Sequence, residues 1–154
     1  MLRLMICGIA AALVLTSPAR AERWRVATEK DDAAPYVLMF IDEASVSRSG
    51  DTATGWVMTV LEPDASGGRD WDHSVILRDI DCSGARSRMA HTKFFVGDSL
   101  IEDNPRPGDW KAINPGTLLD DVAQVMCGRE TYMTEVVRDP VAISREYFAT
   151  LKDK

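Results

Sequence analysis

Three residues of one loop have the side chains that a divalent metal ion could bind. Asp70, Asp72 and His73 fall in the run Asp-Trp-Asp-His, close to two adjacent glycines, and carboxylates and imidazole are common metal ligands. Asp72 and His73 are neighbours, however, so their side chains would point apart if the segment is extended. Acids beside glycines are also typical of solvated turns. We therefore predict no cofactor, and these three residues are the candidate ligands if a metal does bind.

The two histidines are the candidate bases for catalysis. A Ser-His-Asp triad would have to use His73 or His91. His91 lies in a segment with a strand-like pattern and without a catalytic motif around it. The sequence contains no Gly-x-Ser-x-Gly elbow, no Walker loop and no Gly-x-Gly-x-x-Gly fingerprint. We therefore predict that the protein is not an enzyme.

Two of the three cysteines are expected in the mature protein. Cys7 lies in an apolar N-terminal run that export would remove, which leaves Cys82 and Cys127. An even number of cysteines in an oxidising compartment favours a disulfide, and this one would close a loop of 45 residues. A reactive thiol is the alternative. It would need an activating histidine beside an unpaired cysteine, and no motif of that kind is present.

The four tryptophans fall into two pairs. Trp24 and Trp56 lie in strand-like segments and are expected in the core. Trp71 and Trp110 lie in loops beside glycines and acids. Large amphipathic rings in loops suit contact surfaces, so Trp71 and Trp110 are the candidate binding residues. The alternative is that both rings pack over the core.

The N-terminus has the pattern of an export signal. Arg3 precedes an apolar run of 12 residues, from Leu4 to Leu15, and Ala19-Arg20-Ala21 is a small-x-small cleavage site. A helix of that length spans ~18 Å, too short for a hydrocarbon core of ~30 Å. We predict a signal peptide over residues 1–21 with cleavage near Ala21, no membrane span in the mature chain, and a periplasmic, cell-surface or secreted protein.

Charge and composition exclude two classes of partner. The chain has 18 basic and 24 acidic residues, and removal of Arg3 and Arg20 with the signal leaves 16 basic residues and a net charge of −8. Such acidity argues against binding to nucleic acid and to anionic lipid. The apolar share of 45% and the charged share of 27% indicate a globular domain.

The hydrophobic pattern predicts a sheet followed by helices. Apolar–polar alternation or short apolar runs predict strands at 23–28, 36–41, 54–62, 74–82, 86–96 and 99–102. Turns or loops are expected at 42–45, 49–51, 63–72 and 83–84, and the prolines of 104–108 should end the sheet.

Two helices are predicted near the C-terminus. Thr117 is a candidate N-cap and Gly128 a candidate stop for a helix between them, which a disulfide would attach to the strand that ends at Cys82. Residues 130–138 could form a strand or a loose helix. Asp139-Pro140 should begin a second helix over 140–152, packed on its own sheet or on a partner. The fold class is therefore α+β, with an antiparallel sheet of about five to six strands, one or two C-terminal helices packed on it and one disulfide.

The order of these features resembles a known family. The resemblance rests on Trp24, on the run Phe40-Ile41-Asp42-Glu43-Ala44-Ser45-Val46 and on Asp81-Cys82. It also rests on the run Trp110-Lys111-Ala112-Ile113-Asn114-Pro115-Gly116-Thr117, which precedes the helix that ends at Cys127. Residues 22–128 resemble the surface-adhesin protein E-like family of small exported bacterial domains, which leaves 129–154 as a C-terminal extension. The resemblance implies an antiparallel sheet, a C-terminal helix and a Cys82–Cys127 bond. The best-known member binds host matrix proteins and plasminogen.

Together these observations predict an exported, non-enzymatic cell-envelope or periplasmic binding protein. Its expected partner is a protein of the envelope or of the host matrix. Two alternatives remain open, a periplasmic module that binds a small ligand or a metal, and an uncharacterised hydrolase. The sequence assigns no oligomeric state.

Overall fold

The computed structural model describes residues 21–63 and 70–152. The predicted signal peptide therefore lies outside the described residues except for Ala21, and its cleavage stays a prediction. No helix in the described ranges combines the length and the apolar character that a bilayer crossing requires.

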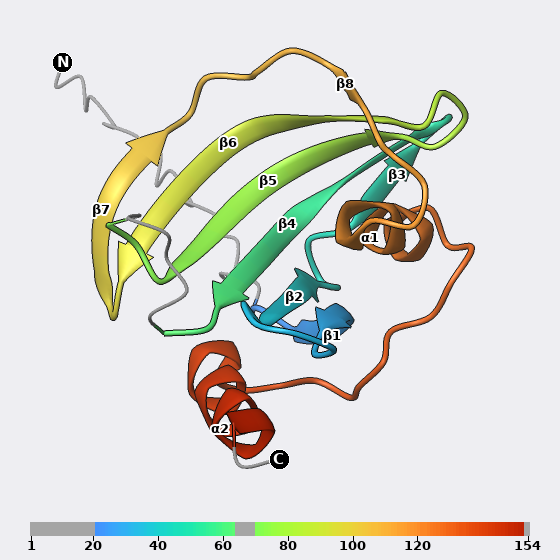
Figure 1. The fold of residues 1–154 in the computed structure, drawn as a ribbon. Coiled ribbons are helices and arrows are strands. Elements are labelled where there is room, and N and C mark those ends of the chain that lie inside the picture. The colour runs from blue at the N-terminus through green and yellow to red at the C-terminus, as the bar shows by residue number, and fades with distance from the viewer. Residues whose placement is uncertain (1–20, 64–69, 153–154) are drawn as a thin grey trace, which may run out of the picture.

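The described strands form one antiparallel sheet in the order β1-β2-β4-β5-β6-β7 (Figure 1). Two short strands lie off this path, because β3 pairs with β4 and β8 pairs with β6. The strands are β1 (Trp24–Lys30), β2 (Val37–Asp42), β3 (Ser47–Ser49), β4 (Thr52–Leu61), β5 (His73–Asp81), β6 (Arg86–Val96), β7 (Ser99–Asn104) and β8 (Lys111–Ala112).

The predicted α+β class and all six predicted strands are confirmed, with corrections at the ends. Ser49 belongs to β3 and not to the predicted turn, and β7 runs on to Asn104. The sheet also resumes at β8, after the prolines that were expected to end it. β3 and β8 are three and two residues long and fully exposed. Such short polar strands carry no apolar alternation that a sequence pattern could detect.

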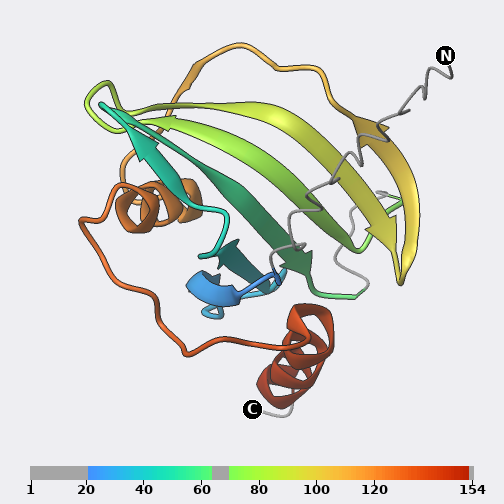
Figure 2. The same ribbon diagram turned by 180° about the vertical axis from the view of Figure 1, so that it is seen from behind.

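The helix α1 (Leu118–Met126) lies on the inner side of the curved sheet (Figures 1 and 2). The Asp120 backbone N–H donates to Thr117 Oγ1 at 3.3 Å, which confirms Thr117 as the N-cap. Gly128 has φ +73° just after the C-cap Cys127, a conformation that favours glycine. The predicted start and stop of this helix are therefore both confirmed.

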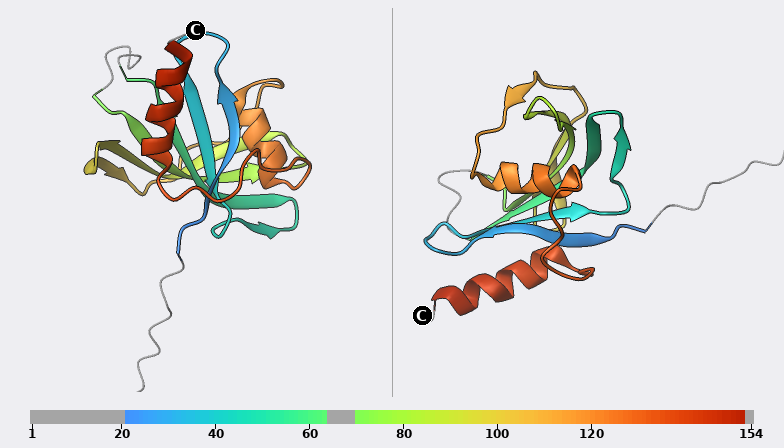
Figure 3. Two further views of the ribbon diagram at one scale, coloured as in Figure 1. Left: turned by 90° about the horizontal axis from the view of Figure 1, so that it is seen from below. Right: turned by 90° about the vertical axis from the view of Figure 1, so that its right-hand side faces the viewer.

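The helix α2 (Pro140–Lys152) lies on the opposite, outer side of the sheet (Figure 3). Its Phe148 is 1% exposed and packs in an apolar cluster with residues of β1, β2 and β4. The second predicted helix is thus present and packs on its own sheet.

The two helices give the sheet an apolar core on each face. The inner core joins α1 to β1, β2, β4 and β5, and its members include Met39, Ile41, Val57, Ile80, Val122, Val125 and Met126. The outer core joins α2 to β1, β2 and β4, and consists of Trp24, Val26, Leu38, Phe40, Met58, Val60 and Phe148. Strands β1, β2 and β4 therefore contribute buried apolar residues to both cores, whereas β6 and β7 contribute to neither.

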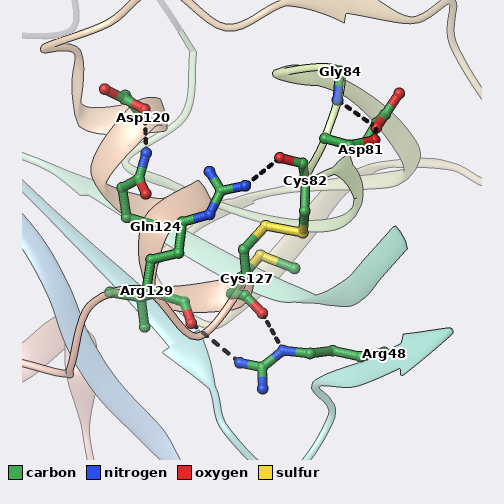
Figure 4. Close-up of a disulfide and its surroundings, with 11 residues drawn as sticks. Arg48, Asp81, Cys82, Gly84, Asp120, Gln124, Cys127 and Arg129 are labelled. Atoms are coloured by element: carbon green, nitrogen blue, oxygen red, sulfur yellow. Dashed lines mark hydrogen bonds between the residues drawn. A yellow bond between two sulfur atoms is a disulfide. The ribbon is translucent and has the colours of Figure 1, made fainter. Parts of the chain in front are cut away.

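A disulfide joins Cys82 to Cys127, with their Cα atoms 5.8 Å apart (Figure 4). It attaches the C-terminal end of α1 to the chain just after β5, as predicted. Two arginines surround it. The Arg48 Nε–H donates to the Met126 carbonyl at 2.7 Å, and Arg129 donates to the Cys82 carbonyl. This corner is therefore held by covalent and polar contacts together.

The segment 130–138, left open between strand and helix, forms neither, apart from one isolated β-bridge between Val137 and Trp24. It runs along the free edge of β1, where the Met133 N–H donates to the Val26 carbonyl at 2.9 Å and the Val137 N–H to the Trp24 carbonyl at 2.7 Å. An unpaired edge strand exposes backbone groups that promote aggregation. The segment covers part of this edge while it carries the chain from the inner to the outer face of the sheet.

Candidate binding surface

The outer face of the sheet is only partly covered. The buried apolar residues on which α2 packs belong to β1, β2 and β4, with Val75 of β5 at the margin, so no described helix covers most of the outer face of β5, β6 and β7. Strand pairing places Trp56 of β4 beside Leu77 of β5, and Leu77 beside His91 of β6. Since residues paired across strands share a face, these three side chains form a row on the uncovered part.

Trp56 is at the centre of one group of contacts on this face. Its ring centroid lies 5.4 Å from that of His91 and 5.3 Å from the Lys93 ammonium nitrogen. His91 Nε2 is hydrogen-bonded to Asp103 Oδ1 of β7. These contacts hold an aromatic ring, an imidazole and a cation next to one another over three strands. Trp56 is half-buried and packs against the outer core, and Trp24 is buried in that core, as expected for both.

Trp110 forms a second group at the other end of β6. Its ring centroid lies 4.9 Å from Arg88 Cζ and 5.8 Å from Arg86 Cζ. The connection that carries Trp110 is held to the edge of β6, because the Gly108 N–H donates to the Met89 carbonyl at 2.8 Å and β8 pairs with Arg86 and Ser87. Trp110 remains 37% exposed. The ring is therefore positioned by stacking and still open to solvent.

Two carboxylates fix the arginines under Trp110. Asp79 accepts from Arg88 Nε at 2.7 Å and from the Thr54 hydroxyl at 2.7 Å. Asp81 accepts from Arg86 Nη2 at 2.6 Å and from the Gly84 N–H at 2.7 Å. The bond from Arg86, followed by the bond from Gly84, lowers the pKa of Asp81 to about 2. Both guanidinium groups are therefore held in fixed positions by carboxylate partners.

We call Trp56, Arg88, His91, Lys93 and Trp110 the outer strip. Aromatic and arginine side chains are enriched at protein contact surfaces, and a ring stacked on a guanidinium has little freedom left to lose on binding. Asp79 pairs with Arg88 and Asp103 with His91, so two side chains of the strip already have carboxylate partners and the strip is not a general anion-binding patch. The chemistry that it offers is stacking and directed hydrogen bonding.

The other candidate tryptophan lies elsewhere. Trp71 packs on Phe94, with 4.9 Å between ring centroids, and Phe94 is paired with Ser74 of β5. Ser74 alternates with the inner-core residues of β5, so this pair lies on the inner face. The structure therefore does not bring Trp71 and Trp110 together.

The candidate metal ligands are arranged differently from the expectation. The chain bends at Asp72, and His73 Nδ1 lies 2.6 Å from Asp72 Oδ1. The two adjacent side chains therefore meet, and the prediction that they point apart is wrong. Asp72 Oδ2 accepts from the Gly97 N–H at 2.8 Å and from Arg145 at 3.1 Å, while Asp70 is exposed. Among the described residues, no three His, Cys, Asp or Glu side chains form a group that could hold a metal ion.

A hollow of about 340 Å³ lies beside His73 on the outer face. The His73 ring is stacked on Phe95, with 4.8 Å between centroids and 5° between planes. The lining includes Trp24, His73, Val75, Lys93 and Phe95, together with Asp139 just before α2. The hollow shares Lys93 with the outer strip, so a partner that covers the strip would also reach it.

Sequence reasoning missed Arg88, its partner Asp79 and Lys93 for a specific reason. Simple alternation places Arg86 and Arg88 on one face of a strand, and His91 and Lys93 on the other. A register shift in β6 opposite Leu77 and Arg78 changes which residues point to which face, because a bulge adds one residue to one strand. All four side chains therefore face outward. The sequence shows that basic residues cluster in this segment, but it does not show that their side chains share a face.

A comparison with protein families agrees with this fold. A family model described as "Surface-adhesin protein E" matches residues 24–128, the span from β1 to the end of α1. No curated protein and no solved structure gives a significant match. The family match therefore covers the sheet, the disulfide and the outer strip, and it ends before the segment that leads to α2.

Proposed function

Because the chain belongs to the surface-adhesin protein E family, we propose that it is an exported, non-enzymatic binding protein of the cell envelope. Family membership supports a surface or exported adhesin-like protein. The disulfide between Cys82 and Cys127 supports an oxidising compartment. The partner that we propose is a protein of the envelope or of the host matrix.

The observation that carries this proposal is the position of Trp110. An aromatic ring of this size is usually buried or partnered, yet Trp110 keeps 37% of its surface exposed while Arg88 holds it in place. A pre-positioned ring beside fixed cations suits a binding hot spot, since little side-chain entropy is lost on contact. We propose that Trp110 is the main contact of the outer strip, and that Trp71, packed on Phe94, has a secondary role.

The histidines favour binding over hydrolysis. His73 pairs with Asp72 and His91 pairs with Asp103. In the described ranges, each ring is hydrogen-bonded to a carboxylate and not to a serine hydroxyl. A nucleophile–base pair is the arrangement that acyl hydrolysis would need. A hydrolase would lose its turnover on substitution of His73 or His91, and a binding protein would have no turnover to lose.

A site-specific crosslinking experiment tests the proposal. A photoreactive phenylalanine derivative replaces Trp110 in the exported protein, and adducts formed in intact cells or on host matrix are identified by mass spectrometry. The control carries the same derivative at Ile143, an exposed residue of α2. We expect one recurrent protein adduct from position 110 that the control does not give. Equal adducts from both positions, or none from position 110, would contradict the proposal.

Point variants provide a second check on purified protein. Once the adduct is known, Trp110→Ala should weaken its binding about ten-fold or more, as expected for a hot-spot ring. Trp71→Ala, a matched change on the inner face, should weaken binding less. Circular dichroism and melting curves show whether either variant has lost its fold.

A further inference from the structure

Arg78 is a partly buried arginine without a partner among the described residues. Its Nε is shielded from solvent and has no hydrogen-bond partner, and no ion pair to Arg78 is formed within the described residues. Other arginines of the protein are paired. Arg25 lies 2.8 Å from Glu43, Arg86 lies 2.6 Å from Asp81, and Arg88 lies 2.7 Å from Asp79. In a chain with 24 acidic residues, an unpaired, partly buried arginine requires an explanation.

Strand alternation places Arg78 on the inner face of the sheet. It lies in β5 between Ile76 and Ile80, which are both buried, and Ile80 belongs to the inner core. Its partner across the sheet is Gly55 of β4. A Cβ atom on Gly55 would lie 3.1 Å from Val46 Cγ2 and 3.3 Å from Met126 Cε. The surroundings on this side are therefore apolar and supply no carboxylate.

The other side of Arg78 is bordered by an irregular part of β6. Arg78 pairs with Met89 next to the register shift of that strand. The Gly108 N–H donates to the carbonyl of Met89, so the connection from β7 to β8 passes this point. In Figure 1 the same connection continues from β8 to α1 on the inner side of the sheet. Bulges often re-aim side chains at functional sites, and Arg78 sits beside one.

The shielding of Arg78 Nε without a hydrogen-bond partner destabilises the fold. Burial lowers the pKa of Arg78, although a guanidinium stays charged in proteins at neutral pH. A buried charge without a partner loses hydration and gains no compensating attraction. Buried polar groups that lack a partner are rare in native proteins, and an absent ion or ligand is one of the usual reasons.

We propose that Arg78 anchors a binding site on the inner face for a small molecule with a carboxylate or another oxyanion. The planar guanidinium presents parallel N–H donors that match the oxygen pairs of carboxylates, phosphates and sulfates. An apolar wall on the β4 side would strengthen such a contact, because the electrostatic attraction is screened less there than in water. This site is independent of the outer strip, which lies on the opposite face.

Nuclear magnetic resonance tests the site directly. The mature, disulfide-bonded protein is titrated with inorganic phosphate and with acetate, and sodium chloride at matched ionic strength serves as the control. The Arg78 Nε–H signal, assigned through its loss in Arg78→Met, should shift saturably with phosphate or acetate and not with chloride. Absence of a saturable shift with both probes up to about 50 mM, a concentration that detects even very weak binding, would overturn the proposal.

Thermal unfolding gives a test that a merely structural arginine would not pass. Arg78→Met removes the charge and keeps a long side chain, so this variant should melt at a higher temperature than the wild type in the absence of the anion. The bound oxyanion should raise the melting temperature of the wild type and leave that of Arg78→Met unchanged. Equal responses of the two proteins would contradict the proposal.

A matched variant separates this site from general salt effects. Arg88→Met removes an arginine of the outer face that has its own carboxylate. It should melt below the wild type and keep the full response to the oxyanion. Arg78→Lys keeps the charge without the planar fork, and its affinity for the oxyanion should fall about three- to ten-fold. If Arg88→Met lost its response to the oxyanion, or Arg78→Lys kept its affinity, the oxyanion would bind somewhere other than Arg78. Either result would contradict the proposal.

Discussion

Arg145 of α2 donates a hydrogen bond to the carboxylate of Asp72 at 3.1 Å. The same carboxylate accepts from the Gly97 N–H in the turn between β6 and β7, and it contacts His73 at the start of β5. One side chain therefore links the outer helix, a β-turn and a strand that are distant in the sequence. Its removal would leave the Gly97 N–H without an acceptor, while removal of Arg145 would leave the other two contacts intact.

Substitutions of Asp72 and Arg145 should lower the free energy of unfolding by different amounts. Asp72→Asn should lower the free energy of unfolding by about 1–2 kcal/mol, since it weakens several charge-assisted bonds at once. Arg145→Ala should cost less than about 1 kcal/mol, because this arginine is half-exposed and its ion pair is screened. Urea unfolding measures both values, with Glu146→Ala as the control on the exposed side of α2. A larger loss for Arg145→Ala than for Asp72→Asn would contradict this description.

Stability should fall at acid pH because of two carboxylates. Arg86 and the Gly84 N–H lower the pKa of Asp81 to about 2. Burial of Asp72 acts to raise its pKa, but the Gly97 N–H, His73 and Arg145 outweigh burial and lower it. A folded-state pKa below the unfolded value of about 3.9 gives stability that is complete above pH 4 and is lost as the pH falls toward 2.

Melting curves between pH 6 and pH 2 check this expectation. The wild type should lose stability mainly below about pH 4. Arg86→Ala should lose less stability than the wild type between pH 4 and pH 2, because the main cause of the lowered Asp81 pKa is gone. Lys111→Ala should lose as much as the wild type. An unchanged loss in Arg86→Ala would show that Asp81 does not contribute to it.

The disulfide should account for a large share of the stability. It closes a loop of 45 residues, and the chain-entropy model relates a loop of that length to ~4 kcal/mol. The double variant Cys82→Ser, Cys127→Ser should lose about this amount of unfolding free energy. Chemical denaturation of the oxidised protein, the reduced protein and the double variant measures the difference. If reduction leaves the denaturation midpoint unchanged, the bond does not stabilise the fold.

The packing of α2 on the sheet should depend on one aromatic residue, Phe148. Phe148 is 1% exposed in the outer core, so Phe148→Ala should cost about 3–5 kcal/mol. Ile143→Ala changes an exposed residue of the same helix and should cost less than about 0.5 kcal/mol. Denaturant titration compares the two variants. Equal costs would indicate that α2 does not pack on the sheet through Phe148.

The mature protein should begin at Glu22. The apolar run from Leu4 to Leu15 and the Ala19-Arg20-Ala21 site predict cleavage there. The intact mass of the protein recovered from outside the cytoplasm should correspond to residues 22–154. The replacement of Ala19 and Ala21 by bulky residues should block processing, since the peptidase accepts small side chains at these positions. A recovered mass that still includes residues 1–21 would refute the prediction.

The amino-acid sequence alone determined the class of fold and its covalent link. Six strands follow from alternation and apolar runs, which are local properties of each segment. Thr117 and Gly128 mark the ends of α1 because capping is also local. Cys82 and Cys127 could be paired because they are the two cysteines left after the predicted cleavage. Only short polar strands such as β3 and β8 escaped detection, since they bury no side chain that would leave a pattern.

Only the tertiary structure decided which side chains share a surface. One extra residue in β6 shifts the phase of that strand and brings His91 and Lys93 to the same face as Arg88. Trp71 and Trp110 look alike as loop residues, yet they lie on opposite faces of the sheet. Arg78 has no carboxylate opposite it, because the residues paired with it across the sheet are Gly55 of β4 and Met89 of β6. Burial and partners depend on contacts between distant segments, and no local pattern in the sequence records them.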